Sequence, residues 1–428
     1  MNRTYTSSGP RSAPRRGTGG IRRTRRIAAG AAAVALALVA TACGGDDKKD
    51  TDSQAAGGSS AQNADMPAAK IVGLWQVKGE DPNAIDDYQN GALIAVDEIN
   101  AKGGVLGKPL EFERVPSGLN PTSARTAFLQ AKDKKPSGMV GFPGGTEAQG
   151  LQRDIDAAGI PIVNVNNDIT LLYGAKNGSE WMFTTNPYDG ATARNMVALA
   201  VKNNWAKIGI LGNELGYGRD GTARTEAAVK GTTAAVGDKR LVPVTATDLT
   251  EAVLALKGSD AVFSWTYPNT LAAQLKQMAQ NNITTPVLGG GSTPVVVNYG
   301  LAKGKEIENL NAVLACLPAI DTRPASKAFN DAYKAKFGTD APPLAAAAHD
   351  AVWMQAEAMK KAGTTTDHGK IKAALEQLTW TEGACQPEYK SDPSHILAHQ
   401  QIAIDYDATG KPTVVDTYKI PELAKGAS

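Results

Sequence analysis

The stretch that decides the fold is 87–104, which reads DYQNGALIAVDEINAKGG. Its apolar side chains recur at the i, i+3, i+4, i+7 spacing that places them on one face of an α-helix: Ala92, Ala95, Val96 and Ile99. Two glycines at its end supply the left-handed conformation that stops a helix. The apolar run IVGLW at 71–75 precedes it, and LEFERV at 110–115, which alternates apolar and charged residues, follows it. The sequence therefore predicts a strand, a helix and a second strand, the βαβ unit of a parallel sheet.

This unit recurs along the chain in two series. The first series continues with helices over 122–132 and 148–158 and strands over 138–142 and 160–165. After a turn at 184–187, the second series predicts helices over 190–203, 220–236 and 270–280 and strands over 206–211, 241–244, 261–265 and 286–289. Helices over 324–337, 344–361 and 370–378 then return to the first half, and a closing hairpin is predicted over 402–407 and 412–419. We therefore expect an α/β protein with two doubly wound halves, between which the chain crosses more than once.

The first 42 residues have the layout of a secretory signal peptide. Arginines precede an apolar run at 27–39, and small residues then lead to Cys43. The run is shorter than the roughly 20 residues that span a bilayer, which argues against an uncleaved anchor. The ending ATAC resembles a bacterial lipobox, in which the thiol of Cys43 would be acylated. Arg25-Arg26 leaves twin-arginine export open as an alternative to general secretion.

Residues 43–67 are rich in Gly, Ser, Asp and Lys and contain no aromatic residue. Such a segment buries too little apolar surface to order itself, so we expect a flexible tether. The whole chain has 45 Lys and Arg against 43 Asp and Glu, and much of the basic excess lies in the leader. The exported part is therefore mildly acidic, which argues against nucleic acid as a partner.

A specific family resemblance begins at 91–107, GALIAVDEINAKGGVLG. This string resembles the first helix and turn of the leucine/isoleucine/valine-binding proteins, the extracytoplasmic receptors of branched-chain amino acid ABC importers. AGIPIV at 158–163, the glycine-flanked Tyr217 and 348–363 support it, and the resemblance spans roughly 70–419. It implies a type I periplasmic-binding-protein fold: two doubly wound parallel-sheet lobes joined by a multi-segment hinge, which closes on a ligand.

The resemblance also implies a domain plan and a set of partners. Lobe 1 is expected over 68–187 plus 318–378, and lobe 2 over 188–317 plus 379–421, followed by a tail at 422–428. The expected partners are a small-molecule solute and ABC permease subunits, with a lipid anchor in the extracytoplasmic face of the cell membrane. We expect a monomer that needs no cofactor and no metal. A lipoprotein of the same fold that senses the solute for a membrane receptor is the alternative function.

Ligands of doubly wound sheets lie beyond the carboxyl ends of the strands, so the loops there contain the candidate site residues. In the loop after 138–142, the amides of Gly144 and Gly145 and the hydroxyl of Thr146 are candidates for a ligand carboxylate. The relatives have a serine where this chain has Gly145. Asn167 and Asp168 follow the next strand, and Asp168 is a candidate either for a ligand ammonium group or for a helix N-cap.

Aromatic candidates come from both halves. Tyr217 matches a residue that closes over the ligand in the relatives, and Tyr267 matches a tyrosine that touches it. Trp265 ends a strand, where it either packs or faces the ligand. Trp75 and Tyr88 are cleft candidates by position only.

The chain departs from the family at Gly291, where amino-acid-binding relatives have a glutamate that pairs with the ligand's ammonium group. A buried ammonium group without a counter-charge costs several kcal/mol. An α-amino acid therefore requires a substitute acid, such as Asp168 or Glu214. The open glycines and the aromatic candidates favour a larger or aromatic carboxylate, an amide or a similar solute.

Enzyme function is not indicated, because the sequence has no phosphate-binding loop, no nucleophile elbow and no cysteine with an evident base. Cys316 and Cys385 are candidates for a disulfide in an oxidising compartment, or for two separate buried thiols. His395 and His399 lead into a strand, where residues four apart are separated by roughly 13 Å. They are therefore expected to be solvated or hydrogen-bonded rather than metal ligands.

Overall fold

The computed structural model describes residues 65–76, 86–118, 120–142 and 144–426, without the side chains of Thr146, Glu147 and Ile169. The predicted signal peptide, Cys43 and most of the predicted tether lie outside these ranges. Within them, no helix is long and apolar enough to cross a lipid bilayer.

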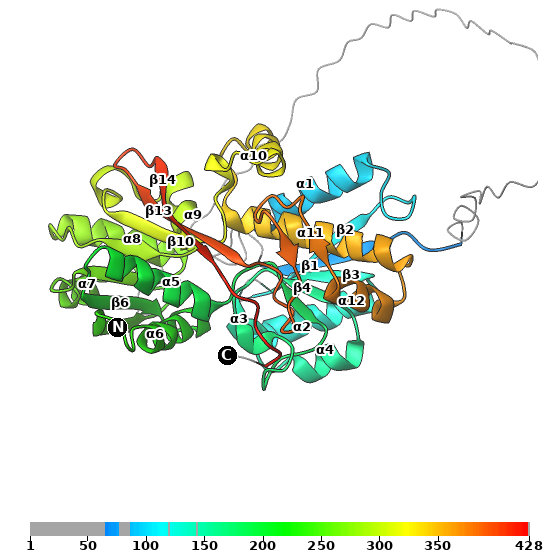
Figure 1. Cartoon of the computed structure of the whole chain (residues 1–428), viewed down its shortest axis with the longest axis horizontal. Helices are drawn as coiled ribbons and strands as arrows, with labels where there is room; N and C mark the ends of the chain where they lie inside the picture. The colour runs from blue at the N-terminus through cyan, green and yellow to red at the C-terminus, as the bar shows by residue number, and fades with distance from the viewer. Residues whose placement is uncertain (1–64, 77–85, 119, 143, 427–428) are drawn as a thin grey trace, which may run out of the picture. The chain divides into compact units, whose positions relative to one another are not determined.

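The first sheet is entirely parallel, in the strand order β2-β1-β3-β4-β5. Its strands are β1 (Lys70–Trp75), β2 (Glu111–Pro116), β3 (Gly138–Gly141), β4 (Ile162–Asn164) and β5 (Met182–Thr184). One face packs against α1 (Asp87–Ala101) and α11 (Pro343–Ala362), while α10 (Pro324–Phe337) packs on α1 and α12 (His368–Glu376) packs on α11. The other face packs against α2 (Pro121–Asp133), α3 (Gly145–Ala148) and α4 (Gln152–Ala158) (Figure 1). Buried cores on both faces make this lobe doubly wound.

The second sheet has the order β14-β13-β10-β9-β8-β6-β7 and is parallel except for its closing hairpin. Its strands are β6 (Lys207–Asn213), β7 (Ala235–Val242), β8 (Ala261–Trp265), β9 (Val287–Gly289), β10 (Leu310–Leu314), β13 (Gln400–Tyr406) and β14 (Pro412–Lys419). On one face lie α5 (Asp189–Lys202) and α6 (Gly216–Ala228). On the other lie α7 (Thr250–Ala255), α8 (Pro268–Gln280) and α9 (Ser292–Asn298). The predicted fold class, two doubly wound α/β lobes, is confirmed.

The second lobe differs from the sequence prediction at one edge. The helix predicted over 220–236 begins at Gly216 and ends at Ala228, and the strand predicted over 241–244 occupies Ala235–Val242. β7 is an edge strand with exposed charged residues, so it lacks the apolar run that marks the other strands. Gly231, in the left-handed region at φ 80°, ends the preceding turn where a longer helix is predicted.

Residues 379–398, which the sequence assigns to lobe 2, pack in the structure with the first sheet. This segment contains the short pair β11 (Thr379–Trp380) and β12 (Tyr389–Lys390). Tyr389 and Leu397 are fully buried in the core that α1 and α11 share with the first sheet. Ile396 bridges to Thr184 at the end of β5. The chain enters the second sheet only at β13.

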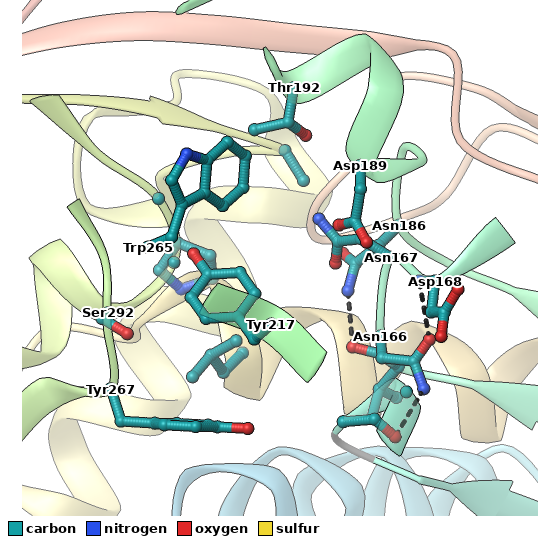
Figure 2. Close-up of a pocket in the computed structure, with 18 of the residues that line it drawn as sticks. Asn166, Asn167, Asp168, Asn186, Asp189, Thr192, Tyr217, Trp265, Tyr267 and Ser292 are labelled. Carbon is teal, nitrogen blue, oxygen red and sulfur yellow. Dashed lines mark hydrogen bonds between the residues drawn. The ribbon is translucent and has the colours of Figure 1, made fainter. Parts of the chain in front are cut away.

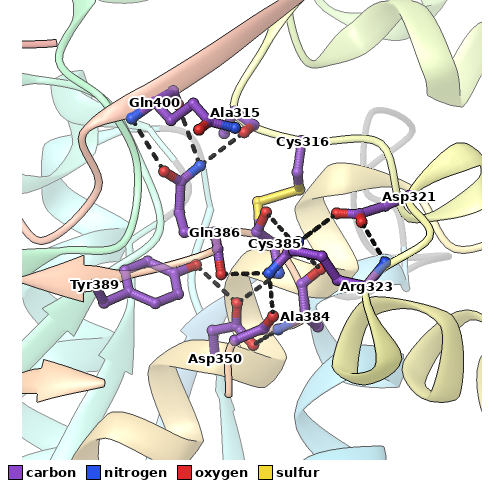
Figure 3. Close-up of polar contacts among 11 residues, drawn as sticks. Ala315, Cys316, Asp321, Arg323, Asp350, Ala384, Cys385, Gln386, Tyr389 and Gln400 are labelled. Carbon is purple, nitrogen blue, oxygen red and sulfur yellow. Dashed lines mark hydrogen bonds and ion pairs between the residues drawn. A yellow bond between two sulfur atoms is a disulfide. The ribbon is translucent and has the colours of Figure 1, made fainter. Parts of the chain in front are cut away.

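A cluster of polar contacts holds together the segments that cross between the sheets (Figure 3). Cys316, just after β10, is joined by a disulfide to Cys385, with a Cα–Cα distance of 5.1 Å. Gln386 Nε2 donates to the carbonyl oxygens of Ala315 (2.7 Å) and Gln400 (3.2 Å). Two crossing segments are therefore tied to the same loop.

That loop is itself held from two sides. Arg323 donates to the carbonyl oxygens of all four residues from Gly383 to Gln386. The buried carboxylate of Asp350 accepts from the amides of Ala384 (2.9 Å) and Cys385 (2.8 Å) and from Tyr389 Oη (2.7 Å). Charge-assisted hydrogen bonds of this kind are stronger than neutral ones, so this cluster of contacts holds the crossing segments in place.

Candidate ligand-binding cleft

A cleft lies where the carboxyl ends of the parallel strands in both sheets meet. Its empty volume, including the part open to solvent, is about 1200 Å³. Lobe 1 supplies the loops after β1, β3, β4 and β5 and the start of α11. Lobe 2 supplies the starts of α5 and α6 and the loops after β8, β9 and β10. This is the position that doubly wound sheets favour for ligands.

Most of the residues singled out in the sequence line this cleft. They are Tyr88, Gly144, Gly145, Asn167, Asp168, Tyr217, Trp265, Tyr267 and Gly291. Trp75 does not line it: its ring is fully buried and stacks on Tyr88 and Phe112, with centroids 6.1 and 6.0 Å away. The side chain of Thr146 lies outside the described part of the chain. A role in ligand binding remains a prediction for all of them.

The lobe 1 wall is polar, and Asn166 holds its loops together. Asn166 Nδ2 donates to the carbonyl oxygens of Phe142 (2.9 Å) and Gly144 (3.2 Å), in the loop after β3. Asn166 Oδ1 accepts from the amide of Asp168 at 3.0 Å. Asn186 Nδ2 donates to the carbonyl oxygen of Val165 at 2.6 Å. These buried bonds fix the loop after β4 between its neighbours (Figure 2).

Asp168 caps the next turn with only one of its carboxylate oxygens. Oδ1 accepts from Thr170 N (2.9 Å) and Thr170 Oγ1 (2.6 Å), at the short 3₁₀ helix Ile169–Leu171. Oδ2 is buried and has no hydrogen-bond partner among the described residues. A Cβ on Gly145 would lie 2.1 Å from this oxygen, so only glycine fits there. The carboxylate of Asp168 therefore lies against the loop after β3, where the sequence predicts a site for a ligand carboxylate.

Two further acids of the cleft were not identified from the sequence. Asp189, at the start of α5, is 8 % exposed, and Asp220 lies on α6 one turn after Tyr217. Burial and the carboxylates of Asp168 and Asp220 raise the pKa of Asp189 well above its ordinary value, an effect that Arg224 reduces. Burial and Asp168 also raise the pKa of Asp220. The signal in the sequence was the spacing of Asp220 from Tyr217, which places both on one helix face.

The lobe 2 wall is aromatic. The ring of Tyr217 meets Trp265 edge-on at 5.5 Å between centroids and Tyr267 at 5.9 Å. Trp265 is 1 % exposed, and its Nε1 donates to Thr225 Oγ1 at 3.1 Å. Figure 2 shows these rings on one side of the cleft and the Asn and Asp side chains on the other.

Glycines allow this aromatic wall to form. A Cβ on Gly221 would lie 2.1 Å from the ring of Trp265, and one on Gly218 would lie 1.9 Å from the carbonyl oxygen of Asn213. α6 therefore approaches β6 and β8 at backbone distance. After β9, a Cβ on Gly290 would lie 2.8 Å from the hydroxyl of Tyr217, whereas Gly291 leaves room for one beside Leu344.

The comparisons with known proteins agree with this geometry. A family model described as periplasmic binding protein matches residues 68–411. The chain belongs to the periplasmic binding protein family. The family is one of solute-binding proteins, and the resemblance seen in the sequence is confirmed.

Three known proteins illustrate the similarity. Leu/Ile/Val-binding protein homolog 8 of Brucella suis biovar 1 is 25% identical over 296 residues, which is 66% of this chain and 73% of that protein. The leucine-binding protein LivK of Thermotoga maritima superposes with a TM-score of 0.73 at 18% identity, over 83% of this chain and 99% of LivK. A solute-binding protein of an ABC transporter from R. palustris, solved with benzoate, gives a TM-score of 0.74 at 16% identity, over 84% and 99%.

In this periplasmic binding protein, contacts outside the cleft also join the lobes. Tyr299, just after α9, donates its hydroxyl to Asp87 Oδ1 at 2.6 Å, and Tyr333 of α10 donates to the same oxygen at 2.9 Å. Asn298 Nδ2 donates to the carbonyl oxygen of Asp340 at 3.1 Å. Tyr299 and Asn298 belong to lobe 2 and their acceptors to lobe 1, so these two bonds form a latch between the lobes, whereas the bond of Tyr333 lies within lobe 1.

The two histidines near the C-terminus of this binding protein make hydrogen bonds. His395 stacks on Phe183 at 4.1 Å between ring centroids, and its Nδ1 lies 3.2 Å from the carbonyl oxygen of Met182. His399 Nε2 lies 3.0 Å from the carbonyl oxygen of Lys390. In the part of the chain that the structure describes, no group of His, Cys, Asp and Glu side chains is arranged to hold a metal ion.

Proposed function

We propose that the protein is the extracytoplasmic receptor of an ABC importer, which captures a small amino-acid-like or amide solute in the cleft. The observation that carries this proposal is the cleft itself, which both lobes line with opposed walls: polar in lobe 1, aromatic in lobe 2. A solute that touches both walls stabilises the closed form, because each wall belongs to a different lobe. LivK of Thermotoga maritima is named as a leucine-binding protein and the R. palustris protein was solved with benzoate, so structural relatives of this chain bind small solutes.

The lobe 1 wall favours a solute that contains N–H groups. Asp168 Oδ2 is a buried acceptor without a partner among the described residues, and burying such a group costs free energy unless a ligand donates to it. An amine or amide group of the solute supplies that donor. The acid that the relatives place at the position of Gly291 is therefore replaced, in this proposal, by Asp168 on the other lobe.

The experiment is a thermal and scattering screen of the mature protein with amino acids, amides, amines and aromatic acids. A cognate solute at about 100 times its Kd adds about 2.7 kcal/mol of stability and raises the melting temperature. The same solute is expected to reduce the radius of gyration, because the lobes close on it. If no solute in the screen raises the melting temperature or compacts the protein, the proposal is wrong.

We also propose that the mature protein is lipid-anchored through Cys43 and hands its solute to a permease. Replacement of the thiol in Cys43→Ser removes the acylation site and is expected to release the protein from membranes into the medium. Asp65→Asn in the same segment is the matched control and leaves the protein membrane-bound. Retention of Cys43→Ser on membranes would contradict the anchor.

A further inference from the structure

We propose that the solute is a small organic cation of net positive charge, whose amine or guanidinium group binds between Asp168, Asp189 and Asp220. This inference rests on the proposed function and narrows it. It excludes simple carboxylates, and it separates this chain from receptors for zwitterionic amino acids of zero net charge.

The first observation is the state of Asp168. The side chain is 7 % exposed, lines the cleft and keeps Oδ2 without a hydrogen-bond partner among the described residues. Oδ1 is already used by Thr170, so the turn does not need the second oxygen. Gly145 has no side chain, which leaves space for this buried oxygen beside the loop after β3. A hydrogen-bond donor would stabilise a carboxylate in this position, and a cationic donor forms the strongest hydrogen bond with it.

The second observation is the charge of the lining. Among the described residues that line the cleft there are three carboxylates and no Lys, Arg or His. Arg224 is close enough to act on Asp189 and Asp220 but does not line the cleft. A solute carboxylate beside one of these acids would be repelled. Burial raises the pKa of Asp189, and a bound cation would reverse part of that effect.

The third observation favours an organic cation over a metal ion. The three carboxylates do not form a group that could hold a metal. The opposite wall presents the rings of Tyr217 and Tyr267, and aromatic faces attract organic cations. A cleft of about 1200 Å³ also holds an alkyl or aryl body next to the charged group.

The arrangement couples charge to closure. Asp168 belongs to lobe 1, and Asp189 and Asp220 lie on the helices α5 and α6 of lobe 2, so closing the lobes brings like charges together. A cation between them removes that repulsion, whereas a neutral solute leaves it in place. The solute that closes the receptor is therefore selected by its charge as well as its shape.

The test compares solutes of matched length and different charge on the mature protein. The probes are 1,4-diaminobutane and agmatine as cations, 1,4-butanediol as the neutral isostere, and succinate, leucine and benzoate. Calorimetry is expected to show binding of at least one cation, and the neutral isostere at least about 30-fold weaker. Asp168→Asn keeps the shape of the side chain and is expected to weaken cation binding by a similar factor. The matched control is Asp416→Asn, which removes a half-buried carboxylate of β14 that pairs with Lys202 of α5, away from the cleft lining.

The outcomes separate this inference from the proposed function. If a neutral or anionic probe closes the protein and Asp168→Asn binds it unchanged, the receptor function stands and the cation inference is wrong. If no probe of any charge raises the melting temperature or reduces the radius of gyration, both are wrong. Circular dichroism of Asp168→Asn shows whether the variant is folded, and Asp220→Asn on the other lobe gives an independent measurement if it is not.

Discussion

The two walls of the cleft are built by different physical means. The lobe 1 wall consists of polar side chains such as Asn166 and Asn186, which hydrogen-bond the backbone of neighbouring loops. The lobe 2 wall consists of aromatic rings that rest on glycines of α6 and the loop after β9. Burying the polar side chains of the first wall costs free energy when no ligand is bound, whereas the rings of the second wall are part of the hydrophobic core.

This difference indicates how the work of binding is divided. In the proposed function, the polar wall, which Asp168 of lobe 1 and Asp189 of lobe 2 share, selects the charge of the solute. The aromatic wall is a rigid apolar surface, which selects the shape of the solute in this proposal and contributes to the stability of lobe 2. Substitutions in the two walls are therefore expected to change the stability of the unliganded protein in opposite directions.

The largest effect is expected for Trp265→Ala. The ring is fully buried, so its removal leaves a cavity and is expected to lower the free energy of unfolding by about 3–5 kcal/mol. Urea unfolding measures the loss. Tyr217→Ala, in the same wall but half-buried, is the matched control and is expected to lose less. An equal loss for both would mean that the wall is not anchored by Trp265.

The opposite sign is expected for Asp189→Asn. Because burial and neighbouring acids raise the pKa of Asp189 above 3.8, the carboxylate destabilises the folded protein at neutral pH. The raised pKa contributes stability below pH 3.8 that is lost as the pH rises through the folded-state value. Asp189→Asn is therefore expected to gain about 0.5–2 kcal/mol at pH 7 and nothing below pH 3.8.

Urea unfolding of Asp189→Asn across this pH range checks both parts. The control is Asp416→Asn, whose half-buried carboxylate pairs with Lys202 away from the cleft. A loss of stability at pH 7 would show that Asp189 makes a stabilising contact and that the two walls do not differ in sign.

The smallest effect is expected for Tyr299→Phe, which removes the latch bond to Asp87 without touching either wall. One hydrogen bond contributes about 0.5–1.5 kcal/mol, so the affinity is expected to fall by about 10-fold or less. The loss is expected to be equal for every solute, because the bond lies outside the cleft lining and contacts no particular ligand. Calorimetry with two solutes measures it, and Tyr173→Phe, which loses a bond to Lys425 away from the cleft, is the control. A loss that depends on the solute would place Tyr299 in recognition.

The sequence located the cleft loops but not all of their chemistry. Tyr217 and Tyr267 were found through the family resemblance, and both line the cleft. Asp189 was not found, because an acid at the start of a helix is commonly explained by the helix dipole. Trp75 was predicted to line the cleft from its place at the end of a strand, but its ring turns into the core between Tyr88 and Phe112.

The sequence by itself determined the two doubly wound lobes. The spacing of apolar residues and the glycines that end helices specify each helix and strand locally, within a few residues of the chain. Only the tertiary structure decided that Asp168, Asp189 and Asp220 share one cleft, that 379–398 packs with lobe 1, and that Asp168 Oδ2 fits above Gly145. The physical reason is that charge interaction and steric fit act through space, between side chains that crossing segments bring together from distant parts of the chain.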